Sequence, residues 1–66
     1  MTPEGARAYL ELCQDIGRAA TVLYRPRCGH TEEGVITRVA GTWVFVDYGR
    51  IGSQATDAAD LEAVAR

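Results

Sequence analysis

One segment of the chain brings metal-binding or nucleophilic side chains close together, Cys28-Gly29-His30. A structural zinc site is built from spaced pairs of Cys or His ligands, and the only further residue of these types is Cys13. A Cys–His nucleophilic pair needs an orienting group and an oxyanion site, and no motif marks either. We therefore expect no metal, no cofactor and no catalytic residue, and predict that the chain is not an enzyme.

Two other patterns resemble functional motifs. One is Gly49-Arg-Ile-Gly52, which has the glycine spacing of the loop that clamps nucleic acid in KH domains. That loop joins two helices, whereas this segment follows a predicted strand. Carboxylates stand together at Glu32-Glu33 and at Asp57 and Asp60, yet paired acid–base groups need a cleft that shifts their pKa values. We interpret the first as a turn and the carboxylates as a solvated loop and a helix cap.

Arginine and aromatic side chains are the remaining candidates. Arg, Trp and Tyr are enriched at the centres of protein interfaces, and Arg can also grip phosphate while an aromatic ring stacks on a base. These side chains either gather around one end of the fold or are scattered along its rim. The binding residues predicted on the first alternative are Tyr24, Arg25, Arg27, Arg38, Trp43, Tyr48 and Arg50.

Length and charge narrow the class of protein. A chain of 66 residues forms one domain, and so small a core is often supplemented by oligomerisation or a partner. The net charge of −2 opposes binding that depends on neutralising phosphates. No apolar run is long enough to span a membrane and the N-terminal residues do not resemble a secretory signal, so we expect a cytoplasmic protein with reduced cysteines.

The first element expected is an amphipathic helix over residues of about 3–16. Thr2 is a suitable N-cap and Pro3 suits the first helical position, where its missing N–H costs nothing. Gly17 suits the left-handed residue that ends a helix. The apolar residues recur at helical spacing and predict a buried stripe, namely Ala6, Tyr9, Leu10, Cys13, Ile16 and Gly17.

Four short strands follow, over residues of about 21–25, 34–39, 42–48 and 53–56. The middle two predict a hairpin with Ala40-Gly41 as its turn, which pairs Val39 with Thr42 and Ile36 with Phe45. One face then lines a small barrel and collects Val35, Thr37, Val39, Val44, Val46 and Tyr48. The opposite face carries Ile36, Arg38, Trp43 and Phe45, so the N-terminal helix or another subunit must cover it. On this face we expect Arg38 to lie opposite Trp43 and to form a cation–π pair with it.

Residues of about 57–65 predict a short C-terminal helix, capped by Thr56 or Asp57 and with Arg66 near its end. The fold class is therefore mainly β within α+β, a single domain over residues 1–66. We expect a small barrel of about 4–5 short antiparallel strands with a helix at each end.

Three segments resemble short, mostly uncharacterised proteins encoded by tailed phages and prophages: Gly34-Val-Ile-Thr-Arg-Val39, Trp43-Val-Phe-Val-Asp-Tyr-Gly49 and Gln54-Ala-Thr-Asp-Ala-Ala-Asp-Leu61. The resemblance covers the last half of the chain and implies an SH3-like or KOW-like small barrel. It further implies a phage or prophage accessory factor in the cytoplasm of a bacterial host. The chain departs from KOW nucleic-acid modules because it has no lysine and a negative net charge.

Two functions are consistent with these residues. The first is a non-enzymatic interaction module that binds a host protein or self-associates. The alternative is a nucleotide, small-ligand or RNA binder, such as a counter-defence protein, in which Arg25, Arg27, Arg38 or Arg50 holds phosphate and Trp43 or Tyr48 stacks on a base. No membrane partner is expected.

Overall fold

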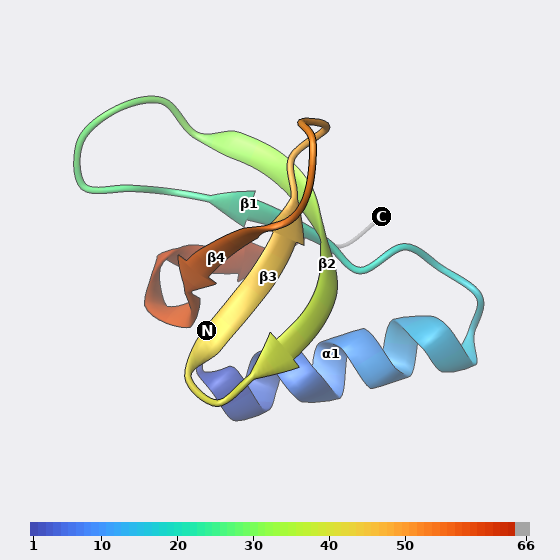
Figure 1. Ribbon diagram of the computed structural model, residues 1–66. Helices are drawn as coiled ribbons and strands as arrows, with labels where there is room; N and C mark the ends of the chain where they lie inside the picture. The colour runs from blue at the N-terminus through green and yellow to red at the C-terminus, as the bar shows by residue number, and fades with distance from the viewer. Residues whose placement is uncertain (65–66) are drawn as a thin grey trace.

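An N-terminal helix and five antiparallel strands make up the protein, in a computed structural model that describes residues 1–64 (Figure 1). The strands form one sheet in the order β4-β3-β2-β1-β5. Among the described residues no ladder joins β4 to β5, so the sheet curves without closing into a barrel. The elements are α1 (Pro3–Asp15), β1 (Thr21–Tyr24), β2 (Glu32–Ala40), β3 (Trp43–Asp47), β4 (Gln54–Asp57), the 3₁₀ turn η1 (Ala58–Asp60) and β5 (Leu61–Ala63).

Helix α1 begins where the sequence predicts. The Thr2 hydroxyl accepts a hydrogen bond from the Gly5 N–H at 3.0 Å, and Pro3 fills the first helical position. The helix ends at Asp15, and Gly17 has the positive φ of +70° that suits glycine. Its buried face is shorter than the predicted stripe, because Ile16 is 57% exposed.

The hairpin turn differs from the prediction by one residue. Gly41 and Thr42 form the turn, so that Ala40 pairs with Trp43 and Val39 with Val44. Gly41 has a φ of +60°, a conformation that a two-residue hairpin turn requires at its first position and that only glycine adopts without strain. Ala40 therefore stays in β2, and the predicted Ala40-Gly41 turn is wrong.

A bulge in β2 decides which residues share a face. The register shifts between Ile36 and Arg38, so Ile36 pairs with Val46 rather than with Phe45. The extra residue is Thr37, whose hydroxyl donates to the Phe45 carbonyl at 3.2 Å. Because one inserted residue reverses the alternation of side chains along a strand, Ile36 shares a face with Val44 and Val46. The predicted pairing of Ile36 with Phe45 on one face is wrong.

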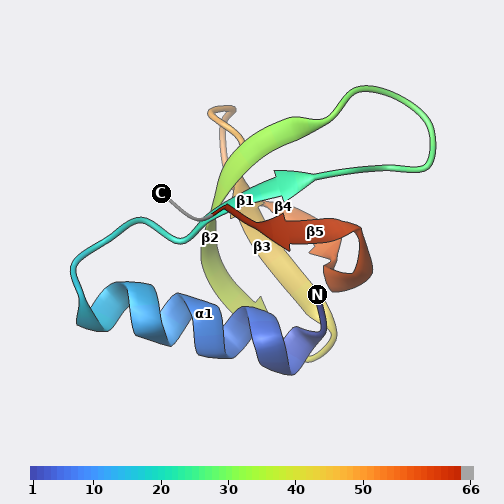
Figure 2. The same cartoon turned by 180° about the vertical axis from the view of Figure 1, so that it is seen from behind.

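The core lies between α1 and the inner face of the sheet. It consists of small and branched aliphatic side chains from the helix, the strands and the connecting segments: Ala6, Cys13, Ala20, Val22, Ile36, Val44, Val46, Ala58 and Leu61. Helix α1 packs against β2 and β3, along one end of the curved sheet (Figures 1 and 2). The helix thus covers the face that carries Ile36, and the opposite face, with Phe45 and Trp43, has no covering element among residues 1–64.

The predicted C-terminal helix over 57–65 is replaced by η1 and β5 over 58–63. Residue 65 and Arg66, which the sequence predicts near the end of that helix, lie outside the described residues. Strand β5 pairs with β1 through Leu61 and Tyr24, which places Leu61 in the core at 3% exposure. A segment this short gains little from helical hydrogen bonds alone. Burial of Leu61 and the ladder with β1 therefore decide its conformation.

Candidate functional site

Four of the seven predicted binding residues line one surface pocket of about 400 Å³. They come from the end of β1, the start of β3 and the loop between β3 and β4: Tyr24, Trp43, Tyr48 and Arg50. The pocket is completed by Glu32 of β2, the whole of β4 and Asp60 of η1. The structure thus brings together four of the seven predicted residues.

Two tyrosines and one tryptophan supply the aromatic surface of this pocket, which we call the aromatic pocket. The ring centroids of Tyr24 and Tyr48 are 6.0 Å apart and their planes are inclined by 55°. The Tyr48 hydroxyl lies 3.0 Å from the hydroxyl of Thr56, which is buried at 7% exposure. Trp43 remains 53% exposed. The pocket thus combines an exposed tryptophan with two tyrosine rings that contact each other.

Tight packing fixes the position of Tyr48. The Cα of Gly34 approaches so closely that a Cβ there would lie 2.8 Å from Cδ1 of Tyr48. Burial raises the pKa of the Tyr48 hydroxyl above its ordinary value of 10.0, and the hydrogen bond with Thr56 opposes that rise. The contact with Gly34 and the hydrogen bond with Thr56 therefore hold the Tyr48 side chain in place.

The charges of the aromatic pocket are mainly negative. Glu32, Asp57 and Asp60 contribute carboxylates, against the single guanidinium of Arg50. Nη2 of Arg50 lies 2.7 Å from Oε1 of Glu32, so these two groups neutralise each other. Asp57 accepts a hydrogen bond from the Ala59 N–H at 3.0 Å and caps η1. The pocket therefore favours cationic over anionic ligands.

Three predicted residues lie outside the aromatic pocket. Arg25 forms an ion pair with Glu62 at 3.0 Å, and both side chains are 61% exposed. Arg27 is exposed in the loop between β1 and β2. The Arg38 guanidinium lies 4.1 Å from the centroid of Phe45, not opposite Trp43 as predicted, because the turn is displaced by one residue.

Sequence reasoning missed the acidic part of the pocket. The sequence predicts Glu32 in a loop, but in the structure it is the first residue of β2 and pairs with Tyr24 across the β1–β2 ladder. The predicted strand begins at residue 34, two residues after Glu32, and the pairing of this segment with Tyr24 depends on the β1–β2 register. Asp60 had no signal of this kind, because its position depends on η1 replacing a helix.

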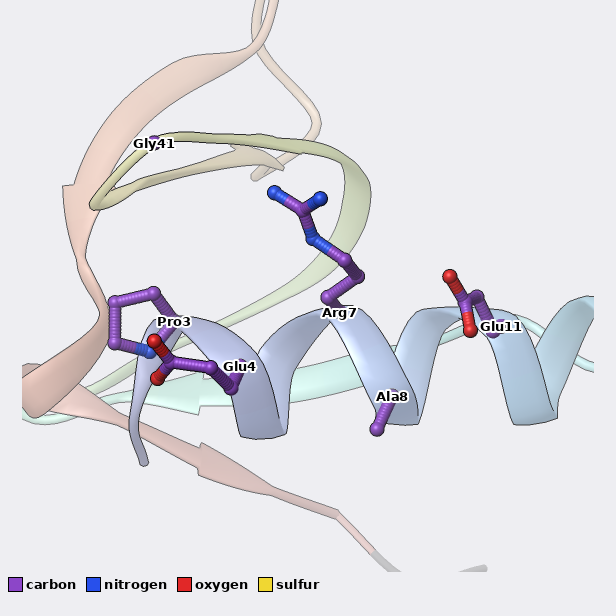
Figure 3. Close-up of a pocket in the computed structure, with 6 residues that line it drawn as sticks. All are labelled: Pro3, Glu4, Arg7, Ala8, Glu11 and Gly41. Atoms are coloured by element: carbon purple, nitrogen blue, oxygen red, sulfur yellow. The ribbon is translucent and has the colours of Figure 1, made fainter.

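Two further pockets border α1. One, of about 430 Å³, lies between the helix and the turn at Gly41 and is shown in Figure 3. There the Arg7 side chain extends from α1 toward the turn, with Glu4 and Glu11 before and after it on the helix. Alternating charges along an exposed helix face are typical of a solvated surface. The other, of about 390 Å³, is more apolar and is lined by Tyr9, Leu12, Cys13, Ile16, Arg18, Ala19, Thr21 and Val64.

The segment Cys28-Gly29-His30 does not assemble a site with Cys13. Cys13 is buried in the core, Cys28 is exposed, and both thiols are free. Within residues 1–64, no cluster of three His, Cys, Asp or Glu side chains has the arrangement of a metal site.

Comparison with known proteins gives no relative: no family model, curated protein or solved structure matches the chain. In the part of the chain that the structure describes, no helix has the length and apolar character needed to cross a membrane.

Proposed function

We propose that this chain is a non-enzymatic interaction module with an SH3-like fold, which binds a protein partner through the aromatic pocket. The observation that carries the proposal is the convergence of Tyr24, Trp43 and Tyr48 on one surface pocket. The proposal includes the accessory role in a phage or prophage that the sequence resemblance implies. A partner protein of the bacterial host, or a second copy of the chain, is then the ligand.

The topology supports the SH3-like part of the proposal. A strongly bent β2 pairs with β1 at one end and with β3 at the other, and a 3₁₀ turn precedes the last strand. Strands β4 and β5 are the two edges of the sheet. We take this strand order as an SH3-like arrangement in which, among the described residues, no hydrogen-bonded ladder joins the two edge strands.

The chemistry of the aromatic pocket supports binding of a protein. Tyrosine and tryptophan offer large contact areas at small conformational cost, and they dominate the energetics of many interfaces. A fixed Tyr48 loses little rotamer entropy when a partner binds, because its hydrogen bond with Thr56 already orients it. An exposed Trp43 supplies apolar area that binding removes from water.

The test compares two variants that remove one exposed apolar side chain each. Trp43→Ser alters the aromatic pocket, whereas Leu12→Ser alters α1, and the two side chains are 53% and 58% exposed. Affinity capture from host lysate, with native mass measurement of the purified chain, gives the readout. We expect one protein, or a defined oligomer, that the wild type and Leu12→Ser retain and Trp43→Ser loses. Identical capture by all three proteins, or a monomer that retains nothing, would contradict the proposal.

One observation favours the alternative, a nucleotide or RNA binder. Arg38 stacks on Phe45 on the uncovered face of the sheet, and Trp43 is two residues from Phe45 on the same strand. Arginine and aromatic side chains on one face are the elements of a stacking platform, although Asp47 and Asp57 flank them and oppose the binding of phosphate. Thermal-shift measurements with nucleotides and short RNA at two salt concentrations test it. A salt-sensitive shift that Arg38→Gln abolishes would favour this function over a protein partner.

A further inference from the structure

The guanidinium of Arg50 is part of the lining of the aromatic pocket. Arg50 lies in the loop between β3 and β4, and its Nη2 atom is 2.7 Å from Oε1 of Glu32, the first residue of β2. Both residues line the pocket together with Tyr24 and Tyr48. The pocket therefore combines a carboxylate that already pairs with a guanidinium and two tyrosine side chains, which are the groups that recognise an arginine side chain.

The loop that carries Arg50 is anchored at its two ends and free at its tip. The Asp47 carboxylate accepts a hydrogen bond from the Gly49 N–H at 2.8 Å, and the Ser53 hydroxyl lies 2.8 Å from that of Thr37. Between these anchors, the side chain of Ile51 is fully exposed, so no packing holds the tip of the loop. The ion pair with Glu32 is the contact through which Arg50 is held among the described residues.

That ion pair is exposed and weak. The side chains of Arg50 and Glu32 are 62% and 37% exposed, and pairs of this kind contribute little to stability. A competing cation can therefore displace Arg50 without unfolding the sheet. The carboxylate of Asp60 adds negative potential to the same pocket.

We propose that Arg50 is an internal competitor, and that a partner's arginine side chain replaces it on Glu32 when the partner binds. This inference rests on the proposed function, because it names the chemical class of the partner: a segment of protein with an exposed arginine. A planar guanidinium fits better than a lysine ammonium, because it pairs with a carboxylate and stacks on tyrosine rings at the same time. Arg50 then lowers the affinity for the partner instead of contributing to it.

The experiment titrates the protein with a capped peptide in which three arginines alternate with serines, and with the same peptide carrying neutral citrulline in place of arginine. Fluorescence of Trp43, the single tryptophan of the chain, reports binding. The decisive variant is Arg50→Gln. Its control is Arg27→Gln, which removes the same charge from an exposed residue that does not line the pocket. Glu32→Gln removes the carboxylate, and thermal unfolding shows that each variant is folded.

We expect Arg50→Gln to bind the arginine peptide about 1.5- to 5-fold more tightly than Arg27→Gln does, the factor set by one exposed ion pair. We expect Glu32→Gln to bind it more weakly than the wild type, and the citrulline peptide not to bind. Equal or weaker binding by Arg50→Gln than by Arg27→Gln would overturn the inference, as would equal binding of both peptides.

The outcome also separates this inference from the proposed function. If Trp43→Ser still loses a partner that the wild type captures while Arg50→Gln behaves like Arg27→Gln, the module stands and the exchange of arginines is refuted. If Arg50→Gln gains affinity for the arginine peptide but no protein is captured, the cation site stands and the proposed protein partner is refuted.

Discussion

Replacement of Gly34 by alanine tests the packing beneath the aromatic pocket. Gly34 is buried in β2, and a Cβ on it would lie 2.6 Å from Cγ1 of Val46, 2.8 Å from Cδ1 of Tyr48 and 2.9 Å from the Asp47 carbonyl oxygen. Real Cβ atoms do not approach other atoms so closely. The carbonyl belongs to the paired strand β3, so a rotamer change cannot relieve all three contacts.

The magnitude follows from two opposing effects. Gly34 has no positive φ, so alanine suits its backbone and would by itself stabilise the fold by about 0.4–1 kcal/mol through the unfolded state. Overpacking of a filled core costs about 1–3 kcal/mol, and here backbone is among the atoms that must move. Because the steric cost is the larger effect, we expect net destabilisation of about 1–2 kcal/mol. In a domain of this size that lowers the Tm by roughly 4–16 °C.

Thermal and urea unfolding of Gly34→Ala, monitored by circular dichroism, give the measurement. The double variant Gly34→Ala with Val46→Ala distinguishes overpacking from other causes, since it removes one of the three clashing groups. Its loss of stability should be smaller than the sum of the losses of the single variants. An unchanged or raised Tm for Gly34→Ala would refute the packing argument. If the stability losses of the two single variants add up in the double variant, the Val46 side chain is not the group that clashes with the new Cβ.

The remaining predictions concern two tyrosine hydroxyls. Tyr9→Phe removes a hydrogen bond of 2.7 Å to the Thr21 carbonyl and should lower the free energy of unfolding by about 0.5–1.5 kcal/mol in urea titrations. Tyr24→Phe is its control, because the Tyr24 hydroxyl forms no hydrogen bond with any residue within 1–64. Equal losses of stability in the two variants would contradict a stabilising role of the Tyr9 hydrogen bond. For Tyr48, burial raises the native pKa above 10.0, so the native state keeps a proton that the unfolded state has lost, and stability should fall as the pH rises above that value. Tyr48→Phe should flatten this part of the pH profile, and a profile as steep as that of the wild type would refute the assignment.

The helix could be predicted from local chemistry. Thr2 and Pro3 act within one helical turn, and their effects on the start of α1 do not depend on the rest of the fold. The β-branched composition of β2 and β3 likewise predicted a hairpin, which the structure has. These local preferences do not determine the order of the strands in the sheet or which element covers each face of the sheet.

The site was only partly predictable for a related reason. Residue types predict Tyr24, Trp43, Tyr48 and Arg50 as binding residues, because Arg and aromatic residues are enriched at interfaces, and the structure places these four on one pocket. Glu32 and Asp60 carry no such signal, since an acidic residue in a short sequence is most often solvated. Their contribution appears only when β1 meets β2 and η1 replaces the predicted helix.

The sequence by itself determined the start of α1, the existence of the hairpin, and the aromatic and arginine residues that the pocket contains. Tertiary structure alone decided the bulge at Thr37, the face on which Ile36 and Phe45 lie, and the conversion of the last segment into η1 and β5. The physical reason is the range of the interactions. Capping and turn preferences act over a few residues, whereas register and the pairing of β5 with β1 are set by burial of Ile36 and Leu61 against residues distant in the chain.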